Sequence, residues 1–361
     1  MTQDTSSRRR FLTSASVASA ALLAGCAGGV STEKTTEGTT TATGHTTTTA
    51  SSDDTTTLRV FDQEAGFVGP YKDAVAQFER KHDVNVEVVG GLGANIVDKY
   101  LVEKQNDIAT ADVLAGWIPQ QLLKAQLDDE LTQPELPELS DRIPERFRNP
   151  LLVRHVAAIV PAYNPNKLEA ADVEPPKSYA ALADDRFAGK VEVVDPVKVG
   201  SAMKVVAYIA NNLGGWDYWR SLHENGAKVV SGYPQVPKDV ISSETDTAVG
   251  ILGLGLGLPA EKEGKPIENV IPTEGAVGSS HALAVNPDSP HPELTRQFIK
   301  EVKFDETVLD FWTDKYLPVT LDGHELPDDS PLSIDDIRTV DWQWMIEHEL
   351  DLKVKWQTIF G

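Results

Sequence analysis

The sequence is poor in cysteine and in basic residues. Its single cysteine, Cys26, excludes a disulfide framework and any zinc or iron–sulfur site of the CxxC type. Lysine and arginine total 33 against 55 aspartate and glutamate residues, which gives a formal net charge of -22. Nucleic acids and anionic lipid surfaces attract basic proteins, so this charge argues against both as partners. A surface this acidic is typical of extreme halophiles, in which high salt screens the repulsion between like charges.

The sequence also lacks the short motifs of several large enzyme classes. It contains no HExxH, GxSxG, P-loop or GxGxxG pattern. We interpret the paired acids at 184–185, 328–329 and 335–336 as acidic surface rather than as catalytic dyads. The histidines are scattered along the chain, which argues against a structural zinc site. We therefore expect a protein that is not an enzyme and that holds no cofactor and no metal ion.

The first residues have the features of an export signal. Residues 7–12 match the twin-arginine pattern S-R-R-x-F-L, and the apolar run at 15–23 is too short to cross a bilayer. Residues 23–26 resemble a lipobox, in which the signal is cleaved just before a cysteine that becomes lipidated. We predict that residues 1–25 are a twin-arginine lipoprotein signal and that Cys26 carries the lipid. The alternative is an accidental cysteine beside an apolar run.

A threonine-rich stretch follows the cysteine. Residues 31–57 include 14 threonines and 3 serines, and they contain no Leu, Ile, Val, Phe, Trp or Tyr. Such a stretch cannot bury enough apolar surface to fold, so we predict a flexible tether over 26–57 that is a candidate for O-glycosylation. The remaining 304 residues are enough for two lobes. This organisation suggests a capture protein, a tethered enzyme or an adhesin on the outer face of the cell membrane.

Short strands alternate with amphipathic helices after the tether. The apolar pattern predicts strands at 58–62, 84–89, 111–114, 190–194, 228–231, 247–252 and 280–285. Helices are expected between them, for example through Tyr71, Val75 and Phe78, which recur at helical spacing. Two α/β sets joined by extended segments predict an α/β fold of two lobes with two hinge crossovers and a cleft. We expect residues 58–160 plus 282–320 in lobe 1 and residues 161–281 in lobe 2. The segment 321–361 is expected to be a helical extension packing on a lobe.

A series of short motifs follows the order seen in one protein family. The matching stretches are 78–81, 84–88, 111–113, 163–164, 176–179, 195–196, 200–202, 215–218, 225–227, 272–275 and 292–298. In this order they resemble the extracellular solute-binding proteins of ABC importers, in the subgroup with ferric-iron, thiamine, polyamine and 2-aminoethylphosphonate binders. The resemblance implies a type II-like periplasmic-binding-protein fold. It also implies a monomer that delivers a small solute to a permease and its ATPase, and the acidic surface suggests a halophilic archaeon.

The sequence departs from the ferric-iron members of that subgroup at one place. Those members commonly carry neighbouring tyrosines soon after the strand that begins here at Thr247. The corresponding stretch, Gly253–Leu258, contains no side-chain oxygen. We therefore expect a small organic solute with an anionic group. A ferric or other metal complex is the first alternative, a polyamine the next, and a tethered hydrolase or an adhesin are the alternatives from other classes.

The candidate ligand residues lie in loops that follow strand ends, because ligands bind at the carboxyl ends of strands in open α/β sheets. Gln63 and Glu64 follow the first strand, where they could hold an anion and an ammonium group. Leu92 and Gly93 precede a helix whose free N–H groups suit an anion. Trp117 follows the third strand and could stack on a ligand, although tryptophan is also a common core residue.

The best anion candidate combines a cation, a glycine, a hydroxyl and a helix start. These are Lys198, Gly200 and Ser201, so replacing Lys198 with alanine is expected to abolish anion binding. Ser201 could instead be only the N-cap of its helix. Tyr233 follows a later strand, and His281 lies at the return crossover, where a structural role is the alternative.

Overall fold

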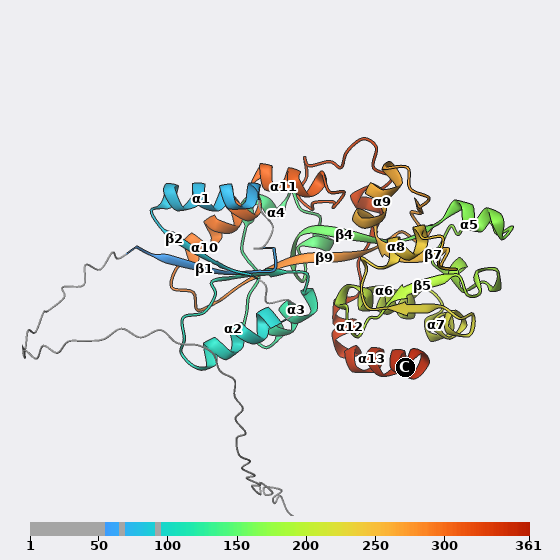
Figure 1. The fold of residues 1–361 in the computed structure, drawn as a ribbon. Helices are drawn as coiled ribbons and strands as arrows, with labels where there is room; N and C mark the ends of the chain where they lie inside the picture. Colours follow the sequence, from blue (N-terminus) through green and yellow to red (C-terminus); the bar gives the residue numbers. More distant parts are fainter. Residues whose placement is uncertain (1–54, 65–68, 91–94) are drawn as a thin grey trace, which may run out of the picture. The chain divides into compact units, whose positions relative to one another are not determined.

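The computed structural model describes residues 55–64, 69–90 and 95–361 (Figure 1). The predictions for the signal, for Cys26 and most of the tether, and for Leu92 and Gly93 lie outside the described residues. The described residues form one compact unit. In this described part, no helix combines the length and the apolar character that are needed to span a membrane.

The first α/β set follows the predicted alternation. Strand β1 (Thr57–Asp62) pairs in parallel with β2 (Asn85–Val89) on one side and with β3 (Val113–Gly116) on the other. Helices α1 (Pro70–His82) and α2 (Ile96–Gln105) make the crossovers. Tyr71, Ala74 and Phe78 form the buried face of α1, close to the spacing predicted from the sequence.

Two long antiparallel strands lie at the centre of the sheet. Strand β4 (Leu152–Tyr163) pairs with β9 (Ala276–Val285), and both run between the two α/β sets (Figure 1). The sequence analysis missed β4 and placed the start of β9 at Ser280, four residues late. Almost every residue of both strands is buried, so neither has the apolar–polar alternation that marks a strand with one solvated face.

The second α/β set continues the same sheet. Its strands are β5 (Val191–Val194), β6 (Lys228–Val230) and β7 (Val249–Gly253). Strand β5 pairs in parallel with β6 and β7, and β7 pairs antiparallel with β4. The main order is β2-β1-β3-β9-β4-β7-β5-β6, with β8 (Glu268–Asn269) beside β4 and β10 (Ile337–Arg338) beside β9. The sheet is therefore mixed, because β4 and β9 run antiparallel to their neighbours in this main order, between the two parallel sets.

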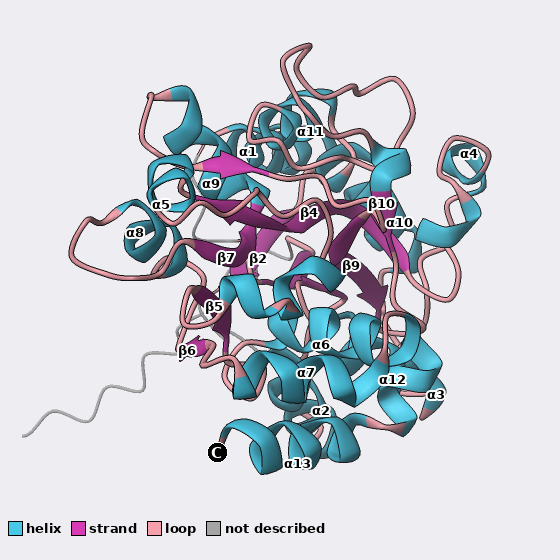
Figure 2. Ribbon diagram, turned by 90° about the vertical axis from the view of Figure 1, so that its right-hand side faces the viewer, coloured by secondary structure: helices cyan, strands magenta, loops and turns pink. Residues whose placement is uncertain are grey.

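Helices lie on both sides of these strands (Figure 2). The helices between β3 and β9 are α3 (Pro119–Leu127), α4 (Pro137–Ser140), α5 (Pro165–Ala170), α6 (Gly200–Asn212), α7 (Gly215–Glu224), α8 (Val236–Ile241) and α9 (Leu254–Lys262). The later ones are α10 (Pro292–Phe298), which continues as a π-helical segment over Ile299–Lys303, α11 (Glu306–Thr313), α12 (Trp342–Glu347) and α13 (Glu349–Phe360).

The C-terminal helices touch elements of both α/β sets. Helix α12 packs on α3, and α13 packs on α6 and α7. The rings of Trp356 and Trp219 meet edge to face with centroids 5.2 Å apart, and both side chains are buried. The helical part of the C-terminal segment is 342–360, and residues 321–341 are mainly loop with the short strand β10.

Candidate functional site

A cavity of about 510 Å³ opens where the strand ends of the two α/β sets face each other. Gln63 and Trp117 border it after β1 and β3, while Ser201 and Gly253 border it from the second set. The central strands contribute residues 157–159 and Ser279. Its position at strand ends and its volume are typical of a small-molecule site.

The charge of the cavity differs from that of the whole protein. Among the described residues that line it, none is aspartate, glutamate or histidine, and the two charged side chains are Lys198 and Lys315. The complete chain has a net charge of -22. The lining therefore favours an anionic ligand locally, although the protein surface is strongly acidic.

Gln63 and Trp117 are brought together by a glycine at the end of β3. The Gln63 side-chain oxygen accepts a hydrogen bond from the Trp117 backbone N–H, with 2.5 Å between the heavy atoms. A Cβ atom at Gly116 would lie 2.4 Å from that same oxygen. Only glycine permits this close approach, so Gly116 helps to hold Gln63 at the cavity wall.

The start of α6 contributes backbone and hydroxyl groups. Gly200 is its first residue and Ser201 its second, and Val199 occupies the N-cap without a side-chain cap. Ser201 is therefore not the N-cap, and it lines the cavity. The Lys198 side chain is 65% exposed and its Nζ lies 3.4 Å from Asp195 Oδ2. That exposure and that partner reduce what Lys198 can contribute to anion binding.

Tyr233 adds a buried phenol to the same wall. Burial raises its pKa, and the nearby Ser201 side chain partly opposes the rise. The Tyr233 oxygen nevertheless has no hydrogen bond of acceptable geometry in the described part of the chain. This buried oxygen, at the wall beside Ser201, is therefore an unsatisfied polar group.

A residue that the sequence analysis missed lies directly behind the cavity wall. The Lys204 ammonium is fully buried and donates a hydrogen bond of 2.9 Å to the hydroxyl of Ser279, which lines the cavity. Burial lowers the pKa of Lys204 from 10.5 to about 7. A signal was present in the sequence, because Lys204 stands between Met203 and Val205 in an otherwise apolar stretch of helix.

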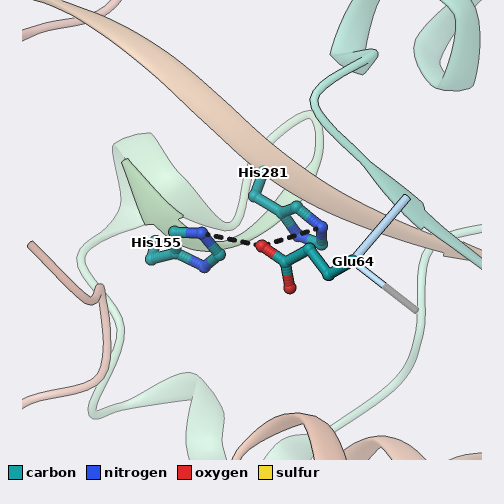
Figure 3. Close-up of side chains that lie close together, drawn as sticks. All are labelled: Glu64, His155 and His281. Carbon is teal, nitrogen blue, oxygen red and sulfur yellow. Dashed lines mark ion pairs between the residues drawn. The ribbon is translucent and has the colours of Figure 1, made fainter. Parts of the chain in front are cut away.

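Glu64 and His281 lie in a buried polar cluster and not in the cavity lining. Glu64 forms an ion pair with Arg154. Its Oε1 also lies 3.1 Å from His155 Nε2 and 3.5 Å from His281 Nε2 (Figure 3). The Trp117 ring packs edge-on against both histidine rings, with centroids 4.8 and 5.3 Å away. The cluster thus supports the tryptophan that borders the cavity.

Within this cluster Glu64 is ionised and the two histidines are neutral near neutral pH. Burial alone would raise the pKa of Glu64, but Arg154 and the two histidines hold that pKa well below its ordinary value. Burial lowers the pKa of His155 to about 4 and holds the pKa of His281 well below its usual range. Arg154 and His155 were not singled out from the sequence, because β4 was not predicted.

The same three side chains have the composition of a metal site. The candidate ligand atoms of Glu64, His155 and His281 lie within 4.8 Å of one another. However, Arg154 Nε donates to His155 Nδ1, so neutral His155 carries its proton on Nε2, facing Glu64. That nitrogen is then a donor and offers no lone pair to a metal. The arrangement fits a buried ion-pair network around Arg154 and Glu64 better than a cation site.

Comparison with known proteins identifies the class. Residues 73–330 match the bacterial extracellular solute-binding proteins, and the chain belongs to this family. An uncharacterised protein of Haemophilus influenzae (strain ATCC 51907 / DSM 11121 / KW20 / Rd) is 29% identical over 215 residues. That match covers 55% of this chain and 59% of the relative, which is less than two thirds of its length.

Solved structures share the fold at low sequence identity. Iron-bound HitA from Pseudomonas aeruginosa has a TM-score of 0.66 at 16% identity over 85% of this chain and 100% of its own. AfuA from Actinobacillus pleuropneumoniae, with fructose 6-phosphate, scores 0.62 at 21% identity over 84% and 98%. Trichodesmium IdiA (FutA), with iron and citrate, scores 0.69 at 14% identity over 84% and 99%.

These similarities confirm the predicted fold class. The chain has the two-lobed α/β fold of periplasmic binding proteins, with two central strands as crossovers and a cleft between the lobes. The family is described as solute-binding proteins, and AfuA is described as a periplasmic binding protein.

Proposed function

We propose that this protein is the solute-binding component of an ABC import system and that its solute is a small organic molecule with an anionic group. The charge of the cavity carries this proposal. The described lining has two lysines and no carboxylate, within a chain of net charge -22. Ser201, Ser279 and Tyr233 add hydroxyl groups, and Trp117 adds an apolar wall for the rest of the solute.

Binding in this proposal is a shift between open and closed forms. Residues 58–160 with 282–320 form one lobe and residues 161–281 the other. The lobes approach each other by bending of β4 and β9, and the closed form presents the solute to a permease driven by its ATPase. The protein acts as a monomer on the outer face of the membrane. From the sequence we add three features to this proposal. They are export by the twin-arginine pathway, a lipid at Cys26 and a tether that ends at residue 57.

A ferric complex is the second candidate solute. Two structural neighbours are described with iron, and Tyr233 supplies a phenol oxygen to the cavity. Ferric iron prefers several anionic oxygen ligands, and no carboxylate lines the described cavity wall. An organic anion such as citrate would have to supply those ligands together with the metal.

A ligand screen by thermal unfolding tests the proposal. The mature chain from residue 26, with Cys26→Ser to prevent lipidation, is melted in high salt with separate ligands. The panel is inorganic phosphate, 2-aminoethylphosphonate, fructose 6-phosphate, citrate, thiamine, spermidine and ferric citrate. A ligand at 100 times its Kd stabilises the protein by about 2.7 kcal/mol, which raises the melting temperature. Stabilisation by spermidine or thiamine alone would contradict an anionic solute.

A further inference from the structure

Lys204 differs from the other buried cations of the described chain. Arg154, Lys204 and Lys303 are all 0% exposed. Arg154 pairs with Glu64, and Lys303 pairs with Asp62. Lys204 has no carboxylate partner among the described residues, and its one hydrogen bond goes to Ser279 Oγ. A buried cation is stable only when a counter-charge or several acceptors compensate it. Lys204 therefore lacks the counter-charge that Arg154 and Lys303 have.

The hydroxyl of Ser279 connects Lys204 to the cavity. An ammonium group donates hydrogen bonds and accepts none, so protonated Lys204 leaves the Ser279 oxygen as acceptor. The hydrogen of the Ser279 hydroxyl is then free to donate, and Ser279 lines the cavity. An anionic oxygen bound to that hydroxyl would lie about 5 Å from the Lys204 nitrogen, given ordinary hydrogen-bond lengths.

We infer that Lys204 and Ser279 form the anchor for the anionic group of the solute, with Ser279 as the direct donor and Lys204 as a positioning residue that acts through it. This inference rests on the proposed function, and it names the residues that would give the cavity its preference for an anion. The bound anion supplies the counter-charge that the protein itself does not. Phosphate, phosphonate and carboxylate groups share the required chemistry.

The surroundings of Lys204 link anion binding to proton uptake. Ser279 on β9 and the ring of Trp342 on α12, whose centroid is 5.7 Å from Nζ, are the groups that face it. Neither titrates near neutral pH, and burial is the sole cause that lowers the pKa of Lys204 to about 7. A bound anion would favour the ammonium, so binding at pH 8 should take up a proton.

Isothermal titration calorimetry of the mature Cys26→Ser chain tests the inference. The probes are inorganic phosphate, fructose 6-phosphate and citrate, in buffers of different ionisation enthalpy at pH 8. We expect Lys204→Met and Ser279→Ala each to weaken binding of the best probe at least tenfold. We also expect proton uptake in the parent chain and none in Lys204→Met. Lys353→Met, on the exposed face of α13, controls for the loss of one positive charge.

The outcomes separate this inference from the proposed function. If Lys204→Met bound the probe as tightly as the parent chain and took up the same proton, the inference would be overturned. The proposed function as an anion-binding importer subunit would not be affected. Failure of all three probes to bind the parent chain would overturn both. If Lys204→Met does not fold, as judged by circular dichroism, Ser279→Ala decides, because it removes the proposed donor to the anion together with the acceptor of the Lys204 hydrogen bond. Tight binding to that variant would then reject the anchor.

Discussion

Glu64 at the end of β1 and Arg154 in β4 form an ion pair that is almost completely excluded from solvent. The two side chains are 3% and 0% exposed. A second buried pair, Asp62 with Lys303, lies beside it and joins the same strand end to the segment after α10. Residues separated by 90 and 241 positions are thus held together behind Trp117. The cavity wall at Trp117 is thus supported by two buried ion pairs whose residues do not line the cavity.

Glu64→Gln should be strongly destabilising. The substitution leaves the Arg154 guanidinium buried without its counter-charge, which costs about 3–5 kcal/mol in comparable cases. Chemical denaturation in high salt would measure the loss of unfolding free energy. Glu87→Gln is the matched control, because Glu87 pairs with Arg59 but its side chain is 48% exposed. That control should change stability by less than about 1 kcal/mol, and equal effects would contradict the assigned role of burial.

Lys204→Met should stabilise the protein increasingly as the pH falls from 10 to 7. The folded state holds the pKa of Lys204 near 7, whereas an unfolded lysine titrates near 10.5. Between these values the unfolded chain binds a proton that the folded chain does not. The parent therefore loses stability as the pH falls, by up to about 5 kcal/mol, and methionine removes the loss.

Denaturation of both proteins at pH 7 and pH 9.5 measures this effect. The stability advantage of Lys204→Met should be larger at pH 7. A difference that stays constant over this interval would mean that Lys204 titrates normally and is not buried as the structure describes.

Glu192→Gln should stabilise the protein at pH 8 and have little effect at pH 4.5. Burial, together with the nearby Asp239, raises the pKa of Glu192 to about 7. From about pH 4.5 to 7 the unfolded chain releases a proton that the folded chain retains, so the parent loses stability as the pH rises. The loss reaches up to about 3 kcal/mol above pH 7. Thermal melts across this range would reveal it, and parallel curves for the two proteins would argue against a raised pKa.

Lys198→Met should weaken anion binding by less than about fivefold. The side chain is 65% exposed and close to Asp195, and exposed ion pairs of this type contribute about 1 kcal/mol or less. The affinity of the best anionic probe for this variant is the relevant measurement. A loss of tenfold or more would make Lys198 the principal anchor, as the sequence analysis expects.

Trp356→Ala should destabilise the chain by about 3–5 kcal/mol, because it removes a buried aromatic side chain from the contact with α7. Leu350→Ala on the same helix is the control, since Leu350 is 73% exposed and should tolerate the change. Equal stability of both variants would mean that α13 does not pack on α6 and α7.

Local sequence patterns determined most of the fold of this protein. The strands of the first set and the helix through Tyr71 follow from apolar spacing, which depends only on neighbouring residues. Gln63, Trp117, Ser201 and Tyr233 were found because loops after strand ends gather at one edge of such a sheet, and all four line the cavity. Their role in binding remains a prediction.

Tertiary structure alone decided which buried polar groups meet. Strand β4 is buried on both faces, so its sequence has no alternation and Arg154 and His155 could not be placed. Glu64 follows a strand end and His281 lies within β9, yet long-range pairing directs both side chains into the ion-pair cluster instead of the cavity. Lys204 and Ser279 are 75 residues apart, and only the packing of α6 against β9 brings them together. Local periodicity reports which face of an element is buried, but the partner of a buried charge depends on the whole chain.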